Sequence, residues 1–205
     1  MSEFDKVAAE WDKNKMHTDR SEAIANKLLP FLENKSLNTA LEYGAGTGLL
    51  SFLLKDRFEE IILMDSSREM VNTANAKIAE TGEKHMKAIF FDLEQDDYTG
   101  KFDIIFTQMV LHHVDNVDLI FQKFNQLLTP EGIMAVADLY TEDGSFHGEG
   151  FTGHLGFEPE QLKKLLLKNG FGQVTYETVF TIKKETQQGI KEFPIFLIFA
   201  QKTSK

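Results

Sequence analysis

The sequence contains no cysteine, and several kinds of chemistry are excluded with it. Disulfides, cysteine zinc sites, iron–sulfur clusters and cysteine nucleophiles all need a thiol or thiolate. Long hydrophobic runs are also missing, because the apolar stretch at 195–200 is far shorter than the roughly 20 residues of a membrane helix. The first residues show no signal-peptide pattern. We therefore expect a cytoplasmic protein that does not associate with membranes.

Basic residues are scarce: 22 Lys and Arg stand against 32 Asp and Glu, a formal net charge of −10. Binding to nucleic-acid phosphates is driven by clustered Lys and Arg, so we expect no nucleic-acid partner. A chain of 205 residues, 42% of them hydrophobic, is long enough to bury a core. The composition therefore predicts a single domain over 1–205, which we expect to be a monomer or a homodimer.

The hydrophobic pattern predicts two N-terminal helices and then an alternation of strands and helices. The helices are expected at 4–15 and 20–31, and Ile24, Leu28 and Phe31 form the apolar face of the second. The expected strands that follow are 40–43, 61–64, 88–91, 102–107 and 133–139, with helices at 49–55, 67–81 and 117–128. This alternation predicts an α/β fold, doubly wound, with a mainly parallel sheet and helices on both faces.

The C-terminal part has a different pattern. After a helix at 160–169, the segment 174–182 alternates like a half-buried strand, whereas 196–200 is apolar on both faces. We therefore expect a C-terminal antiparallel hairpin that completes a seven-stranded sheet, with the last strand inside and its predecessor at the edge. The glycine-rich segment 140–157 fits no element and follows the fifth strand, on the side where α/β sheets bind ligands.

Three glycines, Gly44, Gly46 and Gly48, follow the first strand and precede a helix. Glycine lets the backbone approach a ligand closely, and the start of a helix offers free N–H groups. The spacing is neither the dinucleotide fingerprint nor a Walker A loop. Glu42 precedes the first glycine, and its carboxylate suits an ammonium group better than a pyrophosphate. A tight structural turn is the alternative explanation.

Acidic residues also follow the second and third strands. Asp65 stands where a carboxylate can accept hydrogen bonds from ribose hydroxyls. Its alternative role is to cap the next helix, although Ser66 or Ser67 can do so instead. Asp92 is placed to accept a hydrogen bond from the exocyclic amine of a purine, and a loop-start acid without function is the alternative.

Together these motifs resemble the class I S-adenosylmethionine-dependent methyltransferase family, and the continuation at 109–114 resembles the small-molecule branch related to ubiquinone and menaquinone methyltransferases. The resemblance implies a Rossmann-like fold, S-adenosylmethionine as cofactor, and N-terminal helices at 1–35 that form a lid over a core at 36–205. The residues that it assigns to cofactor binding are Glu42, Gly44, Ala45, Gly46, Asp65, Ser66, Met70, Asp92, Leu93, Thr107 and Gln108.

Methyl transfer from a sulfonium needs positioning and exclusion of water, and a general base only where the acceptor must lose a proton. His112, His113, His154 and His147 are our candidates for that base, with Asp138 and Tyr140 behind them. A structural role for the His112–His113 pair is the alternative. The spacing of His147, His154 and Asp138 matches no metal-ligand pattern, so we expect no bound metal.

The sequence thus predicts direct methyl transfer to a small-molecule acceptor. Two alternatives are a protein that binds S-adenosylmethionine without catalysis and a nicotinamide-dependent oxidoreductase. The glycine spacing, Glu42 and the expected hairpin all count against the oxidoreductase. The residues after the fourth strand lack the Pro-Pro-aromatic motif of nucleic-acid amino methyltransferases.

Overall fold

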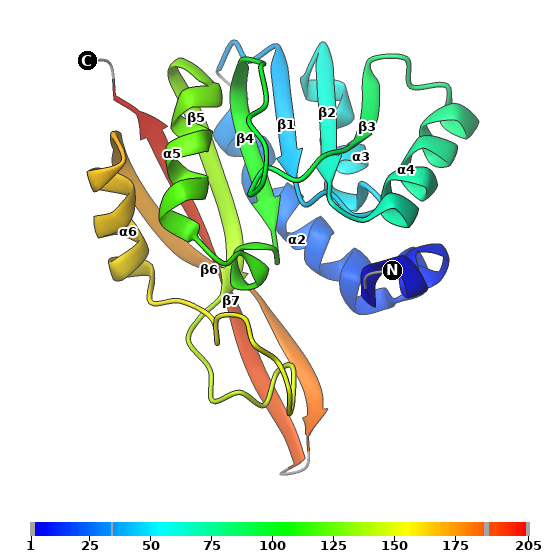
Figure 1. Cartoon of the computed structure of the whole chain (residues 1–205), viewed down its shortest axis with the longest axis vertical. Coiled ribbons are helices and arrows are strands. Elements are labelled where there is room, and N and C mark those ends of the chain that lie inside the picture. Colours follow the sequence, from blue (N-terminus) through cyan, green and yellow to red (C-terminus); the bar gives the residue numbers. More distant parts are fainter. Residues whose placement is uncertain (1–2, 34, 187–188, 204–205) are drawn as a thin grey trace.

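The computed structural model describes residues 3–33, 35–186 and 189–203, and its centre is one twisted seven-stranded sheet (Figure 1). The strand order is β3-β2-β1-β4-β5-β7-β6. The strands are β1 (Thr39–Tyr43), β2 (Glu60–Asp65), β3 (Met86–Phe90), β4 (Phe102–Gln108), β5 (Leu128–Leu139), β6 (Phe171–Thr186) and β7 (Gly189–Lys202).

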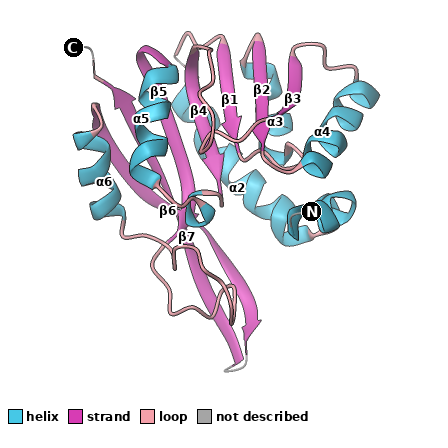
Figure 2. Ribbon diagram, in the orientation of Figure 1, coloured by secondary structure: helices cyan, strands magenta, loops and turns pink. Residues whose placement is uncertain are grey.

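The sheet is parallel from β3 to β5 and antiparallel at its C-terminal edge (Figure 2). Strand β7 lies between β5 and β6 and runs antiparallel to both. The burial pattern in the sequence predicted this insertion, and the structure confirms it. The reason is visible in β7, where Ile195–Phe199 are buried on both faces of the sheet. Strand β6 is mostly exposed or half-buried instead, and the alternation expected over 174–182 is wrong, since Tyr176 and Thr178 are both exposed.

Two hydrophobic cores lie on opposite faces of the sheet. On one face α2 (Lys15–Leu32), α3 (Leu49–Leu54) and α4 (Arg68–Thr81) pack against the strands through residues such as Leu28 and Leu50. On the other face α5 (Val117–Leu127) and α6 (Pro159–Lys168) pack through residues such as Phe121 and Leu166. The doubly wound architecture predicted from the sequence is therefore confirmed.

The N-terminal helices differ from the prediction in their boundaries. The first consists of a short α1 (Glu3–Val7) and a 3-10 helix, η1 (Ala8–Lys13). Helix α2 begins at Lys15 rather than at residue 20, because the Asn14 side chain caps it by accepting the N–H of Met16 at 3.1 Å. Phe31, expected on its buried face, is 36% exposed and stacks on Phe199 with the ring centroids 4.1 Å apart.

Strands β6 and β7 are much longer than predicted and form a hairpin that projects beyond the other strands (Figure 1). The sequence gives no hydrophobic alternation between 183 and 192, although backbone pairing continues there. The segment 140–157 packs along this projection, where Lys191 binds Asp143 at 2.7 Å and Phe146 contacts Phe193. Among the helices described, none is both long and apolar enough to cross a membrane.

Candidate active site

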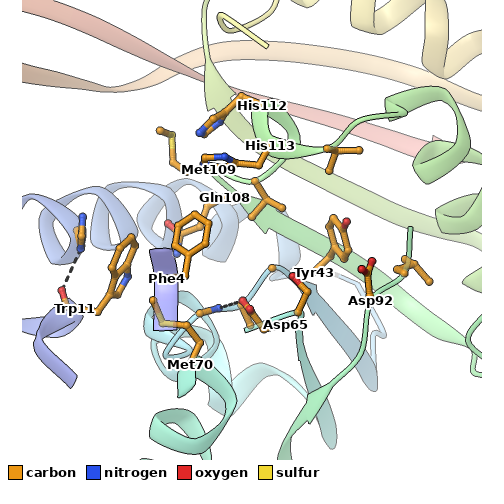
Figure 3. A pocket seen from close by; sticks show the side chains of 18 of the residues that line it. Phe4, Trp11, Tyr43, Asp65, Met70, Asp92, Gln108, Met109, His112 and His113 are labelled. Atoms are coloured by element: carbon orange, nitrogen blue, oxygen red, sulfur yellow. Dashed lines mark hydrogen bonds between the residues drawn. The ribbon is translucent and has the colours of Figure 1, made fainter. Parts of the chain in front are cut away.

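A cavity of about 390 Å³ opens at the carboxyl ends of β1, β2 and β4, on the side predicted for ligands (Figure 3). Its volume lies within the range of small-molecule sites. Of the eleven cofactor-binding residues expected from the sequence, nine line it: Gly44, Ala45, Gly46, Asp65, Ser66, Met70, Asp92, Leu93 and Gln108. The fold therefore brings most of the predicted site together around one space.

The glycine-rich loop forms one wall of the cavity and has a conformation that needs glycine. Gly44 has a φ of +65°, and a Cβ there would lie 2.4 Å from Cγ2 of Val110. Gly46 has a φ of +56°, and its N–H donates to Oδ2 of Asp65 at 2.7 Å. The loop after β1 is thus fastened to the end of β2.

Asp65 holds the centre of this network. Its Oδ1 accepts the N–H of Ser67 at 2.7 Å, while the cap of α4 is the Ser67 side chain, which accepts the N–H of Met70. Burial raises the pKa of Asp65, and the two backbone N–H groups oppose that rise. Each carboxylate oxygen has used only one of its two acceptor positions, so Asp65 can still accept two further hydrogen bonds.

Asp92 and Leu93 line the cavity from the segment after β3. Oδ1 of Asp92 accepts the N–H of Glu94 at 3.0 Å, and its carboxyl group lies near the Tyr43 side chain in Figure 3. Lys123 fixes the backbone below by donating to the carbonyl of Leu93 at 2.8 Å. The segment after β3 therefore brings a carboxylate to the cavity, and hydrogen bonds to Asp92 and Leu93 hold this segment in place.

Glu42, contrary to our expectation, lies outside the cavity lining. Side chains alternate along β1, so Tyr43 reaches the cavity whereas Glu42 points toward α3. There its Oε2 accepts both the N–H and the hydroxyl of Ser51, at 3.0 and 2.5 Å, and Oε1 has no partner among the described residues. Burial raises the pKa of Glu42 to about 8, so it is mostly protonated at neutral pH.

The raised pKa of Glu42 predicts a pH-dependent stability that the variant E42Q removes. The folded protein binds the proton of Glu42 more tightly than the unfolded chain does. The contribution of this proton to the free energy of unfolding is therefore complete below pH about 4.5 and is lost as pH rises to about 8. Urea unfolding between pH 5 and pH 9 should show E42Q gaining stability relative to the wild type by a few kcal/mol, roughly 1.4 kcal/mol per unit. Parallel pH curves for the two proteins would contradict the prediction.

Thr107 is the second expected residue that lies outside the cavity lining. Its side chain is buried, and its hydroxyl has no partner among the described residues. The next residue on β4, Gln108, points the other way and lines the cavity. Oε1 of Gln108 accepts the hydroxyl of Ser21 at 3.1 Å, which connects the end of β4 to α2.

Arg20 is a cavity residue that we did not predict. It is only 5% exposed, its Nε has no hydrogen-bond partner among the described residues, and Nη1 lies 3.9 Å from Sδ of Met16. Desolvation lowers the pKa of Arg20 to about 10, although Asp138 opposes this. It lies one helical turn before Ile24 and two before Leu28, so a charge on the buried stripe of α2 was the signal in the sequence.

The N-terminal elements close one side of the cavity, where Phe4, Trp11 and His17 line it. Asp12 ties η1 to the body by accepting the Thr47 hydroxyl at 2.5 Å and the Lys77 ammonium at 2.6 Å. Figure 3 shows the rings of Phe4 and Trp11 next to one another, with Met70 below Phe4 and Gln108 above it, and the two ring centroids are 6.2 Å apart. The expected lid residues therefore contribute directly to the wall.

Three histidines line the cavity beside this N-terminal cover, where the rings of Phe4 and His113 have their centroids 5.2 Å apart. His112 and His113 come from a 3-10 helix, η3 (Leu111–His113), and His147 comes from the segment 140–157. Desolvation, helped by His112, lowers the pKa of both His113 and His147 to about 4, so both are neutral at neutral pH. His154, another candidate for the general base, does not line the cavity. Its Nε2 lies 3.0 Å from the carbonyl of Val114.

Comparison with known proteins identifies this chain as a member of a methyltransferase family. A family profile described as "Methyltransferase domain" matches residues 16–176. An uncharacterized methyltransferase of Schizosaccharomyces pombe is 30% identical over 148 residues, which cover 64% of this chain and 52% of the relative. The ubiquinone biosynthesis O-methyltransferase of Bartonella bacilliformis is 25% identical over 195 residues, covering 81% and 79%.

Solved structures agree on the fold. The complex between the Haloferax volcanii Trm112 methyltransferase activator and "the putative methyltransferase" contains a chain that superposes with a TM-score of 0.78 at 16% identity, over 100% of this chain and 99% of that one. The chain spans about half the length of the first curated relatives that it matches, 52%, 43% and 42%.

Proposed function

The chain belongs to the class I S-adenosylmethionine-dependent methyltransferases, and we propose that it transfers a methyl group from this cofactor to a small-molecule acceptor held in the same cavity. When bound, S-adenosylmethionine supplies a methyl group activated on a sulfonium. The protein's task is then to hold donor and acceptor in line and to exclude water.

Arg20 is the observation that carries the cofactor assignment. The buried guanidinium of Arg20 lines the cavity and has no anionic hydrogen-bond partner among the described residues, which is costly. The methionyl part of the cofactor carries a carboxylate, the planar ion that a guanidinium binds best. Arg20 and Gln108 would hold this end beside Gly44. Asp65, with two acceptor positions free, would hold the ribose hydroxyls, and Asp92 with Leu93 the adenine.

The small-molecule acceptor is supported by the enclosure of the cavity. Phe4 and Trp11 cover it from the N-terminal side, and Phe146 and His147 from the segment 140–157. The acidic net charge of −10 is unsuited to nucleic acid. His112, His113 and His147 face the acceptor and are the groups that can promote loss of its proton. The sequence relationship to a ubiquinone biosynthesis O-methyltransferase favours the same class of acceptor.

The experiment is a transfer assay with methyl-labelled S-adenosylmethionine and a panel of phenols, carboxylic acids, amines and thiols, with tRNA and total protein as competing substrates. We expect label on a small molecule, with one S-adenosylhomocysteine formed per methyl group. Tight binding of S-adenosylhomocysteine by calorimetry without transfer to any acceptor would instead identify a non-catalytic binder. Label on tRNA or protein alone would contradict the small-molecule acceptor.

A further inference from the structure

Three imidazole rings converge on one point at the acceptor end of the cavity. His112, His113 and His147 each offer a ring nitrogen, and these three atoms all lie within 4.8 Å of one another. The ring centroids of His112 and His113 are 4.2 Å apart, and that of His147 is 4.9 Å from His112. Figure 3 shows His112 and His113 together at this end, above Gln108. Neutral imidazole is a preferred ligand of Zn²⁺ and related ions.

Asp138 fixes the orientation of the first ring. Its Oδ1 lies 2.6 Å from Nδ1 of His112, and both side chains are almost fully buried. Asp138 itself is held by the N–H of Leu139 at 2.7 Å. A neutral His112 that donates its Nδ1–H to this carboxylate has its lone pair on Nε2. Histidines that ligate metals usually have this carboxylate partner on the opposite nitrogen.

His147 provides a second, independent observation. Its Nδ1 is buried and has no hydrogen-bond partner among the described residues. The ring lies flat on Phe151, with centroids 3.8 Å apart and planes 10° apart, which fixes its orientation. Buried polar atoms are nearly always satisfied, so an unpartnered nitrogen beside two other imidazoles indicates a missing ligand.

A general base alone does not account for these features. The Asp138–His112 pair has the arrangement of a base and its orienting carboxylate. That interpretation leaves the unpartnered Nδ1 of His147 and the convergence of His113 without explanation. A cation between the three rings explains all of them.

We propose that His112, His113 and His147 bind one transition-metal ion, with Zn²⁺ the best fit, and that Asp138 orients His112 in this site. Three protein ligands leave a fourth position, which faces the cavity as in catalytic rather than structural zinc sites. An oxygen of the acceptor, a hydroxyl or a carboxylate, would occupy that position, and a bound hydroxyl would release its proton to solvent more readily. This role rests on the proposed function, whereas metal binding itself does not.

The loop around His147 has room for the adjustment that a metal requires. Zinc–nitrogen bonds of about 2.0–2.1 Å place tetrahedral ligands about 3.3 Å apart, so the longest separation, 4.8 Å, must shorten by roughly 1.5 Å. Gly148 and Gly150 follow His147, both with positive φ, and a Cβ at either would meet nothing within 4 Å. The set differs from the one that we rejected in the sequence, since His154 does not belong to it.

The test is calorimetric titration of Zn²⁺ and Co²⁺ into the full chain after removal of metals with EDTA. We expect one ion per chain, and for Co²⁺ the visible absorption of a four-coordinate complex. Mutating a hydrogen-bond partner of a metal ligand costs roughly 10- to 100-fold in metal affinity. H147A and H113A remove a ligand itself and should therefore lose more affinity than that. H85A is the matched control and should bind normally, because His85 lies elsewhere, with Nε2 3.2 Å from the carbonyl of Lys55.

Hydrogen exchange of the segment 144–152 gives a readout that does not depend on activity. Zinc should slow exchange there in the wild type and in H85A but not in H147A. Absence of zinc binding, or equal binding by wild type and H147A, would overturn the site. Zinc binding through these histidines in a protein that transfers no methyl group would leave the site standing and refute the proposed function instead.

Discussion

Replacing Arg20 by methionine (R20M) should weaken cofactor binding by about 30-fold or more and at the same time stabilise the ligand-free protein. Removing one partner of a buried, hydrogen-bonded charge pair costs about 2–5 kcal/mol, and each 1.4 kcal/mol is tenfold in affinity. Without ligand, Arg20 is a buried cation without an anionic hydrogen-bond partner among the described residues. Methionine removes that cost, which is about 1–3 kcal/mol or more for an unsatisfied buried group.

Decarboxylated S-adenosylmethionine makes this test specific. If Arg20 binds the carboxylate, the wild type should bind the intact cofactor much more tightly than the decarboxylated one, and R20M should bind both alike. The matched control is K27M on the same helix, because Lys27 forms only an exposed pair with Glu177. An R20M variant that binds the cofactor normally but has a raised KM for the acceptor would mean that Arg20 binds an anionic group of the acceptor and not the carboxylate of the cofactor.

The second large effect is expected at Asp65, where D65A should weaken S-adenosylhomocysteine binding by about 100-fold or more, since each 1.4 kcal/mol is tenfold in affinity. The alanine variant loses charge-assisted hydrogen bonds to two ribose hydroxyls, worth about 1.5–3 kcal/mol each in protein stability. It also releases the N–H groups of Gly46 and Ser67, which loosens the loop after β1. Calorimetry with S-adenosylhomocysteine measures the change.

A 2′-deoxyribose analogue of S-adenosylhomocysteine separates the two contributions. If Asp65 contacts the ribose, deleting that hydroxyl should weaken binding to the wild type but have little further effect on D65A. Loss of affinity in D65A with an undiminished effect of the missing hydroxyl would mean that Asp65 acts only through the loop. Thermal unfolding of the free protein reports the cost to the loop itself.

The order of strands and loops along the sequence predicted which segments meet at the cavity. It did not predict which side chains of a strand point into the cavity. Glycines with positive φ and acids at the ends of parallel strands must meet at one edge of the sheet, so Gly46, Asp65 and Asp92 could be assigned. Glu42 and Thr107 lie outside the cavity lining because each points to the opposite face of its strand. One residue's shift in register reverses such an assignment.

Contacts between segments that are distant in the sequence could not be predicted from it. Hydrogen bonding extends β6 and β7 past their apolar pattern, and the segment 140–157, which carries His147 to the cavity, packs along the resulting projection. The same segment is bonded to η3, where the N–H of His154 donates to the carbonyl of His112 at 2.8 Å. Arg20 had a local signal, a charge on a buried stripe. Its meaning nevertheless depended on the absence of a partner among the described residues, which a sequence does not contain.

The segment that covers the cavity from the N-terminal side is held mainly by polar contacts rather than by a core. Of the described side chains from Phe4 to Lys13, only that of Ala8 is buried, and Asp5 and Asp12 make the connections to Ser67, Thr47 and Lys77. A region with so little buried apolar surface opens locally at a small fraction of the global free energy of unfolding. We therefore expect this segment to open by losing a few polar contacts, while the sheet and both of its cores stay intact.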